Sequence, residues 1–198
     1  MARVGVLALQ GGYAAHESVL ARLGHSAHRV RTPEDLKGLD GLIFPGGESS
    51  VHLKLIGRLG LAAPLDSFVA AGHPVLGTCA GLILAARRVL NPAQQSMGWL
   101  DVAVTRNGYG RQQESFESVA DQDGMPLLFI RAPRIVELGP GVEVLATHMG
   151  EPVMVRQGRI TGVAFHPELT GDDRVHEQVF GRSETVGGSG LTGPSETS

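Results

Sequence analysis

The sequence predicts an α/β fold in which a mainly parallel central sheet is flanked by helices and extended by antiparallel additions. Up to about residue 100, short apolar runs alternate with segments of helical periodicity, and Gly, Pro or Ser residues separate them. From residue 101 the chain changes to short alternating segments divided by turn signals, which favours antiparallel pairs. In such a flavodoxin-like arrangement, ligand sites lie at the carboxyl ends of the parallel strands.

The first half alternates strand and helix patterns. Each strand candidate is an apolar run typical of a strand covered on both faces, and Gly24 and Gly72 lie where a left-handed residue ends a helix. Thr32 and Pro33 supply a capping residue and a proline at the first helical position. The predicted strands are 3–10, 27–31, 41–45 and 74–78, and the predicted helices are 14–23, 51–59, 61–71 and 82–89, with a further helix starting at 33.

The second half reads as strands followed by one helix. Turn signals at 107–108, 123–124 and 157–158 separate several of the segments. The predicted strands are 101–106, 112–119, 127–131, 142–148, 152–156 and 159–165, and the predicted helix is 173–180.

Composition limits the function classes. The 198 residues suit one domain, which we expect over 1–180, and the Gly- and Ser-rich segment 181–198 predicts a flexible tail. A net charge of -3 offers no basic surface for nucleic acid or for an anionic membrane. The lone Cys79 excludes an internal disulfide and zinc sites with two thiolates, and no pair of histidines has a metal-helix spacing, so we expect no metal. Together with an N-terminus too short in apolar residues for a signal peptide, this predicts a cytoplasmic protein.

The only thiol lies in a strand-to-helix turn. Residues 77–81 read Gly-Thr-Cys-Ala-Gly, the thiol counterpart of the nucleophile elbow, in which small neighbours permit a strained turn. A helix N-terminus favours the thiolate, whereas a free cysteine is only about 3% ionised at pH 7. The alternative is a small buried core cysteine. The glycines on both sides of Cys79 favour the nucleophile.

A second candidate group is His166-Pro167-Glu168, which follows a predicted strand. In an extended backbone, positions i and i+2 face the same side, so Glu168 could orient the imidazole of His166. A strand-end salt bridge is the alternative for this tripeptide alone. Beside a cysteine elbow, the same residues predict a Cys-His-Glu triad in which the histidine takes the thiol proton.

A glycine loop follows the predicted strand 41–45. Residues 45–50 read Pro-Gly-Gly-Glu-Ser-Ser, which fits a flexible turn with a Ser N-cap or an oxyanion hole. In the second interpretation, an N–H of Gly46 or Gly47 pairs with the N–H of Ala80 to bind a developing oxyanion.

These motifs resemble one family. The segments 7–11 (LALQG), 44–50 (FPGGESS), 77–84 (GTCAGLIL), 105–116 (TRNGYGRQQESF), 130–133 (IRAP) and 165–169 (FHPEL) are similar to the glutaminase subunits of pyridoxal 5′-phosphate synthases, which are class I glutamine amidotransferases. The resemblance extends from residue 3 to about 180. GTCAG and FHPEL suit many class I amidotransferases, whereas LALQG, RNGYGRQ and IRAP favour this branch.

The resemblance implies an activity and a set of roles. Cys79 would be the nucleophile, with His166 and Glu168 completing the triad, and Gln10 would lie beside the oxyanion loop and face a partner subunit. The implied glutamine-binding residues are Gly47, Glu48, Ser49, Arg106, Ile130 and Arg131. Arginines at strand ends usually face solvent, but Arg106 and Arg131 could recognise the α-carboxylate of glutamine, and Glu48 could receive its α-ammonium group. The implied reaction is hydrolysis of L-glutamine to L-glutamate and ammonia, without a cofactor. The ammonia would pass to a (β/α)₈ synthase subunit in an assembly of up to twelve copies of each subunit.

Other functions fit less well. A different amidotransferase subunit would keep the fold, but LALQG and IRAP argue against it. A non-catalytic scaffold would not need Cys79, His166 and Glu168 together. A cysteine peptidase has no use for charged groups suited to a free amino acid. We expect His52, His73, His148 and Arg111 to be structural or exposed.

Overall fold

The computed structural model describes residues 1–106, 108 and 115–182. It contains five α-helices, two 3-10 helices and twelve strands within that part of the chain. In chain order they are β1 (Arg3–Leu7), α1 (Tyr13–Arg22), β2 (Ser26–Val30), η1 (Pro33–Leu36), β3 (Gly41–Phe44), α2 (Ser49–Arg58), α3 (Ala62–Ala70), β4 (Val75–Thr78), α4 (Ala80–Ala85), β5 (Ala86–Leu90), β6 (Leu100–Thr105), β7 (Ser115–Val119), β8 (Pro126–Ile130), β9 (Arg134–Leu138), β10 (Glu143–His148), β11 (Glu151–Gln157), β12 (Ile160–Val163), η2 (Pro167–Leu169) and α5 (Arg174–Phe180).

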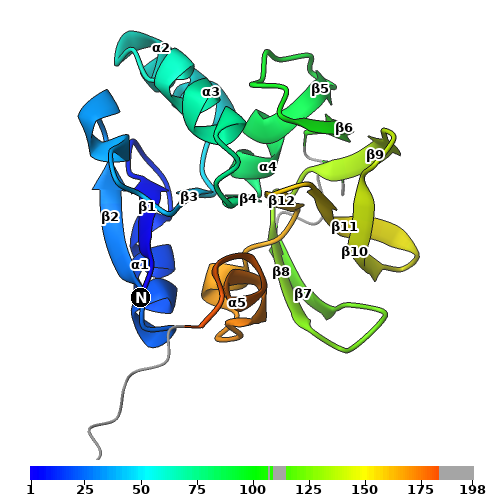
Figure 1. Ribbon diagram of the computed structural model, residues 1–198. Helices are drawn as coiled ribbons and strands as arrows, with labels where there is room; N and C mark the ends of the chain where they lie inside the picture. Colours follow the sequence, from blue (N-terminus) through cyan, green and yellow to red (C-terminus); the bar gives the residue numbers. More distant parts are fainter. Residues whose placement is uncertain (107, 109–114, 183–198) are drawn as a thin grey trace, which may run out of the picture.

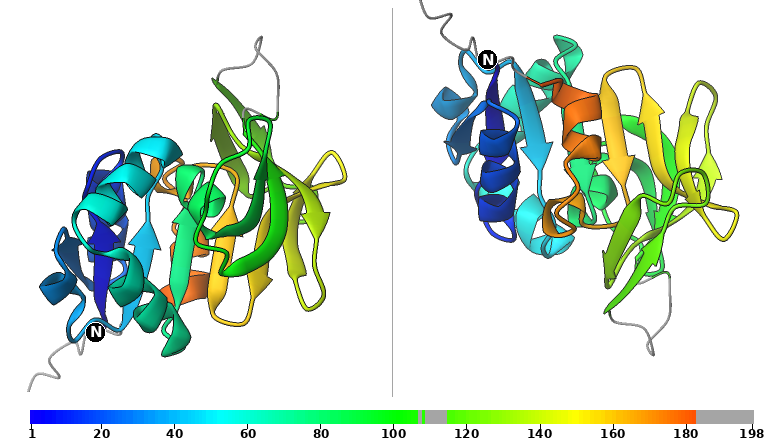
Figure 2. Two further views of the ribbon diagram at one scale, coloured as in Figure 1. Left: turned by 90° about the horizontal axis from the view of Figure 1, so that it is seen from above. Right: turned by 90° about the horizontal axis from the view of Figure 1, so that it is seen from below.

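The central sheet has seven strands in the order β10-β11-β12-β4-β3-β1-β2. The five strands from β12 to β2 are parallel, and β11 and β10 add antiparallel strands at one side. Helices α2, α3 and α4 cover one face and α1 and α5 cover the other (Figures 1 and 2). This arrangement confirms the predicted α/β class and its antiparallel additions.

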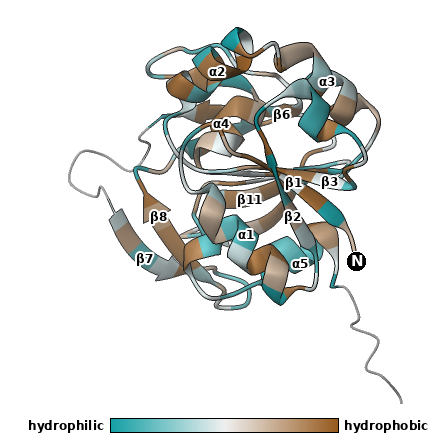
Figure 3. Cartoon of the chain, turned by 90° about the vertical axis from the view of Figure 1, so that its left-hand side faces the viewer, coloured by the Kyte–Doolittle hydropathy of each residue, from teal (hydrophilic) through white to brown (hydrophobic). Residues whose placement is uncertain are grey.

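Burial explains why these short runs become strands. Every residue of β3, β4 and β12 is buried, because helices cover both faces of the parallel part of the sheet. In Figure 3 the strands between the two helical layers are mostly hydrophobic, while the helices carry hydrophilic residues on their outer sides. Gly24 and Gly72 have φ values of 77° and 80° and end α1 and α3, as predicted.

The structure corrects the sequence analysis in the region after Cys79. The predicted helix 82–89 is wrong in its second half, because α4 ends at Ala85 and Ala86–Leu90 forms β5. This strand pairs in parallel with β6, with Val89 opposite Val104, in a three-stranded sheet that also contains β9. The sequence analysis predicted no strand at Arg134–Leu138. Backbone pairing with β6, the next strand along the chain, supplies the hydrogen bonds that a longer α4 would have made internally.

The other predicted elements occur with boundaries shifted by one to three residues. The segment at 33 forms only a short 3-10 helix, in which Asp35 accepts a 2.8 Å hydrogen bond from the N–H of Thr32. The predicted strand 112–119 is described only from Ser115 onward, and Arg111 and the tail from 183 lie outside the described residues. Within the described part of the chain, no helix is long and apolar enough to cross a membrane.

Candidate active site

Cys79 occupies a strained turn between β4 and α4. Its backbone has φ 50° and ψ -101°, an uncommon conformation for a non-glycine residue. Small neighbours make the turn possible: a Cβ added at Gly81 would lie 2.0 Å from the Phe44 carbonyl oxygen, and one at Gly77 would lie 2.8 Å from Gly81. Strain of this kind, stored where the surrounding packing fixes it, is typical of a nucleophile elbow. The predicted turn geometry is therefore confirmed.

The pairing of β4 with β12 brings His166 to the same edge of the sheet. Thr78 lies opposite Val163 in the parallel register, and the N–H of Cys79 donates a 2.9 Å hydrogen bond to the Val163 carbonyl oxygen. His166 follows Val163 by three residues, and its N–H donates a 2.8 Å hydrogen bond to the carbonyl oxygen of Leu128 in β8. Neighbouring parallel strands therefore deliver the thiol and the imidazole to one site, and Cys79 and His166 line the same pocket.

Glu168 is buried behind the imidazole. Its Oε1 lies 2.7 Å from Nδ1 of His166. Nε2 is therefore the nitrogen of that ring that could exchange a proton with the sulfur of Cys79. The expected extended backbone is wrong, because Pro167–Leu169 forms a 3-10 turn. The turn folds the carboxylate back toward the histidine, whereas an extended chain would have placed the two side chains side by side.

The charges of the three groups support one another. Burial lowers the pKa of His166, but hydrogen bonds and charge interactions with Cys79 and Glu168 outweigh it and raise the pKa to about 10. Burial likewise raises the pKa of Glu168, but the imidazoles of His16 and His166 outweigh it, and the net pKa is lowered. Glu168 is therefore an anion and His166 a cation at neutral pH. This charge distribution suits a cysteine that must react as a thiolate.

The loop after β3 closes over the histidine. A Cβ added at Gly46 would lie 2.4 Å from Cε1 of His166, and Gly47 has a φ of 144° that favours glycine. Gln10, at the end of the β1 segment, donates from Nε2 to the Glu48 carbonyl oxygen at 2.9 Å. The same nitrogen lies 3.0 Å from Nδ1 of the buried His52. Gln10 therefore braces the loop from the side opposite His166.

A pocket of about 170 Å³ opens in front of Cys79. This volume is well below the roughly 300 Å³ at which drug-sized sites begin, so it suits a small metabolite. Its lining residues are Gly47, Glu48, Ser49, Cys79, Ile83, Arg106, Ile130, Arg131 and His166. Every residue that the sequence analysis assigned to glutamine binding is in this group. The structure also brings Ala80 to the site, as the first residue of α4 after Cys79.

An ion pair between two lining residues, Arg106 and Glu48, lies at this pocket. Nη2 of Arg106 lies 2.7 Å from Oε1 of Glu48, and the two side chains keep 21% and 41% of their surface exposed. Arg131 has a φ of 44°, uncommon for a non-glycine residue, and the preceding Ile130 carbonyl oxygen lies 3.7 Å from the Cys79 sulfur. An amino acid entering the pocket could divide this ion pair, with its carboxylate on the arginine and its ammonium on the glutamate.

Three residues of the site were missed from the sequence. Ile83 lines the pocket, and its position four residues after Cys79 on a helix was a usable signal. His16 lies against the buried Glu168 and His176 lies against His16, and neither has a local signal because 160 residues separate the two histidines.

Comparisons with known proteins agree with this geometry. Residues 6–184 match the model of the SNO glutamine amidotransferase family. The chain is 54% identical over 179 residues to pyridoxal 5′-phosphate synthase subunit PdxT of Koribacter versatilis, covering 88% of this chain and 92% of the relative. It is 50% identical to the PdxT subunit of Corynebacterium jeikeium, covering 88% and 93%.

Solved structures show the same fold. A structure described as a glutamine amidotransferase superposes with a TM-score of 0.84 at 45% identity, covering 89% of this chain and 96% of that one. PurLQS from Thermotoga maritima superposes with a TM-score of 0.67 at 18% identity, covering 90% and 98%, and this likeness concerns the fold alone.

Proposed function

The chain belongs to the SNO glutamine amidotransferase family, and from this premise we propose that it acts through Cys79, His166 and Glu168. It is a glutaminase that hydrolyses L-glutamine to L-glutamate and ammonia, and the ammonia is used to make pyridoxal 5′-phosphate, as the names of its PdxT relatives indicate. The observation that carries the residue assignment is that a strained cysteine and a histidine line one small pocket, with a buried carboxylate hydrogen-bonded to the histidine from behind.

The first half-reaction forms a thioester. The proton shared by Cys79 and His166 is on His166 when the sulfur attacks the side-chain amide carbon of glutamine. The carbonyl π electrons move to oxygen, and N–H groups of Ala80 and of Gly46 or Gly47 bind this oxyanion. The oxyanion collapses, the C–N bond breaks, and the imidazolium of His166 protonates the departing nitrogen. Ammonia leaves, and a glutamyl thioester and a neutral imidazole remain.

The second half-reaction restores the enzyme. Nε2 of His166 takes a proton from water, and the resulting hydroxide attacks the thioester carbon. The C–S bond then breaks, glutamate leaves, and the thiolate again faces an imidazolium. Glu168 fixes Nδ1 of the ring throughout both steps, so that Nε2 faces the reacting atoms.

The pocket recognises the free amino acid end of glutamine. Arg106 or Arg131 binds the α-carboxylate through charge-assisted hydrogen bonds, and Glu48 accepts from the α-ammonium. Ser49 and the backbone of Gly47 and Ile130 complete the lining. No cofactor enters this mechanism.

The ammonia passes to a synthase subunit with the (β/α)₈ fold. Free ammonia is mostly protonated at neutral pH and is then not nucleophilic, so delivery within an assembly preserves it. Gln10 lies beside the oxyanion loop and faces this partner, in assemblies of up to twelve copies of each subunit. A thiol nucleophile has to stay reduced, which favours the cytoplasm.

Replacement of the nucleophile tests the assignment. Cys79→Ala is expected to abolish glutamate release while leaving glutamine binding largely intact, because the pocket keeps its charged groups. Isothermal titration with glutamine and a coupled glutamate assay measure the two properties. Full glutaminase activity in the variant would refute the proposed nucleophile.

Mixing with a synthase subunit tests the pathway. Glutamine-dependent formation of pyridoxal 5′-phosphate is expected only with both subunits, and ammonium salt should bypass the Cys79→Ala defect. Docking of the synthase subunit also organises the oxyanion hole, so the chain alone should release little glutamate. Equal glutamate release with and without the synthase subunit would contradict this role of the partner.

A further inference from the structure

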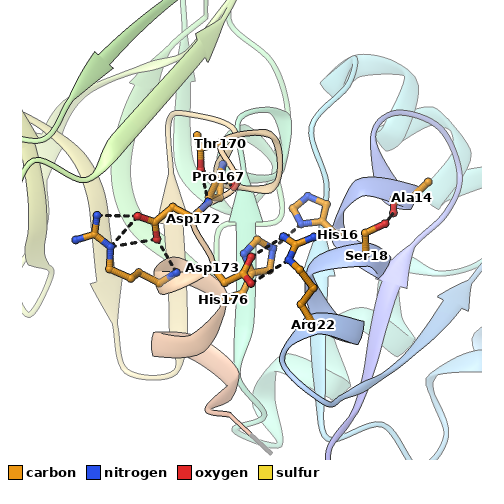
Figure 4. A network of polar contacts seen from close by, with 10 residues as sticks. Ala14, His16, Ser18, Arg22, Pro167, Thr170, Asp172, Asp173 and His176 are labelled. Carbon is orange, nitrogen blue, oxygen red and sulfur yellow. Dashed lines mark hydrogen bonds and ion pairs between the residues drawn. The ribbon is translucent and has the colours of Figure 1, made fainter.

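Two histidines that the mechanism above does not use are buried against the triad. His16 on α1 and His176 on α5 are both fully buried, and their side chains point toward each other across the helical layer on that face of the sheet (Figure 4). Nδ1 of His16 lies 2.8 Å from Nε2 of His176. On its other side, Nε2 of His16 lies 3.6 Å from Oε1 of Glu168 and 3.3 Å from Oγ1 of Thr78.

Both histidines are neutral at physiological pH. Burial lowers the pKa of His16, against the opposing charge of Glu168. Burial and the neighbouring His16 lower the pKa of His176 to about 3, although Glu168 and Asp173 oppose this. The charge of His166 also lowers the pKa of His16. Two further charges act on His176: Asp173 raises its pKa and Arg22 lowers it, and these two side chains form a 2.6 Å ion pair beside it (Figure 4).

Electrostatics selects one arrangement of the protons. In a neutral imidazole, one ring nitrogen carries a hydrogen and the other a lone pair. If Nε2 of His16 carried the lone pair, it would face the Glu168 carboxylate and repel it. With the hydrogen on Nε2, the positive end of the N–H bond faces that carboxylate instead, and Nδ1 becomes an acceptor. Nε2 of His176 is then the donor in the 2.8 Å hydrogen bond.

The remaining polar atoms agree with this arrangement. Among the described residues, Nδ1 of His176 and Oε2 of Glu168 are buried without a hydrogen-bond partner. If Nδ1 of His176 carried the hydrogen, a buried donor would be unsatisfied; here it carries only a lone pair. Oε1 of Glu168 is the oxygen that both His166 and Nε2 of His16 face, and Oε2 lacks a partner. The buried carboxylate therefore has few donors around it, and the N–H dipole of His16 adds to its stabilisation.

We propose that His16 is a positioning residue that stabilises the ionised Glu168 carboxylate through its Nε2–H, and that His176 fixes the tautomer in which it does so. The inference rests on the proposed role of Glu168 in the triad. The chain of contacts then runs from the sulfur through His166 and Glu168 to His16 on α1 and His176 on α5. Neither of these two helices lines the glutamine pocket. The 3.6 Å separation makes the interaction with Glu168 electrostatic rather than a hydrogen bond.

Replacements that imitate one ring nitrogen at a time separate this role from simple packing. The side-chain nitrogen of glutamine can take the place of Nε2, whereas that of asparagine can take the place of Nδ1 only. His16→Gln should therefore keep kcat within about threefold of wild type, and His16→Asn should lower it by about 10- to 100-fold, the range seen when partners that orient metal-bound histidines are lost. KM for glutamine should change little in both, because His16 is remote from the pocket. Ser18→Ala, at an exposed position on the same helix, is the matched control.

The pH profile supplies a readout that loss of packing would not change. Without the Nε2–H, the Glu168 anion is less stable, so it takes up a proton at higher pH. The acidic limb of the kcat/KM profile should move to higher pH by about one unit in His16→Asn, which corresponds to a tenfold change in the protonation constant. In His16→Gln the limb should stay in place. His176→Leu should shift the acidic limb in the same direction but by less. If His16→Asn does not fold, the shift in His176→Leu tests the proposed role of the two histidines.

The experiment uses the assembly with the synthase subunit, with a thermal melt for each variant. Glutamate release is measured from about pH 3.5 to about pH 9, because the pKa of Glu168 is lowered and the acidic limb of the wild type lies in the acidic part of this range. Glu168→Gln separates the proposed triad role of Glu168 from the positioning role of His16. If Glu168→Gln keeps full kcat, the proposed triad itself fails. If Glu168→Gln is inactive but His16→Asn has wild-type kcat and an unmoved acidic limb, only the role of His16 is refuted. The same conclusion follows if His16→Gln falls as far as His16→Asn.

Discussion

Gly46 provides the sharpest test of how closely the loop 45–50 fits His166, the proposed catalytic histidine. Alanine at this position would place a Cβ 2.4 Å from Cε1 and 3.0 Å from Nδ1 of His166, about 1 Å short of the 3.4 Å at which ordinary contact begins. Gly46 does not have a positive φ, so its backbone accepts alanine and the clash alone decides the outcome. The imidazole ring has to retreat by about 1 Å into the pocket. A misplacement of this size is expected to cost about 100-fold in kcat.

The assay compares Gly46→Ala with Gly57→Ala in the assembly with the synthase subunit. Gly57 lies in α2 and has nothing within 4 Å of an added Cβ, so its replacement should leave kcat unchanged and stabilise the helix by about 0.5 to 1 kcal/mol. Because the ring can move into the open pocket, Gly46→Ala should melt within a few degrees of wild type. A Gly46→Ala enzyme with more than half of the wild-type kcat would refute the geometric argument.

Three further predictions follow from the structure. Arg106→Lys should raise KM for glutamine about tenfold with kcat nearly unchanged, because lysine keeps the charge but loses the planar fork, and steady-state kinetics would show it. The free energy of unfolding should fall as the pH drops from 6.5 toward 4. Burial lowers the pKa of His52 to about 4, so in this range the unfolded chain binds a proton that the folded chain does not. Denaturant titrations should show a shallower fall of the unfolding free energy with pH in His52→Gln. Gly81→Ala should destabilise the protein by about 3 kcal/mol in the same titrations, because its Cβ would lie 2.0 Å from the Phe44 carbonyl oxygen.

The strand pattern was readable from the sequence because burial on both faces leaves a simple signal. The runs that became β1, β3, β4 and β12 are short, apolar and bounded by glycine or a polar turn, and few other structures fit such runs. The elbow around Cys79 was equally local, since a tight turn needs small residues at fixed positions. The candidate pocket residues came from the resemblance to a known family rather than from such patterns.

Where contacts with another segment of the chain decided the local structure, the prediction from the sequence was wrong or silent. Ala86–Leu90 contains good helix formers, yet it is a strand because β6 lies beside it. The strand Arg134–Leu138 also depends on pairing with β6 and was not predicted. The turn that returns Glu168 to His166 was expected to be extended, because a proline tripeptide alone does not show the contacts that bend it.

The sequence by itself determined the fold class and the two local motifs, the cysteine turn at 77–81 and the His-Pro-Glu segment at 166–168, because each of these depends on residues that are close together along the chain. Only the tertiary structure decided that the two motifs meet and what surrounds them. The parallel register of β4 and β12 placed the sulfur and the imidazole at one edge of the sheet, and the packing of α1 and α5 on one face of the sheet buried His16 against Glu168 and His176 against His16. Burial and electrostatic contact depend on distances in space, and residues 160 positions apart leave no trace of such contact in a single sequence.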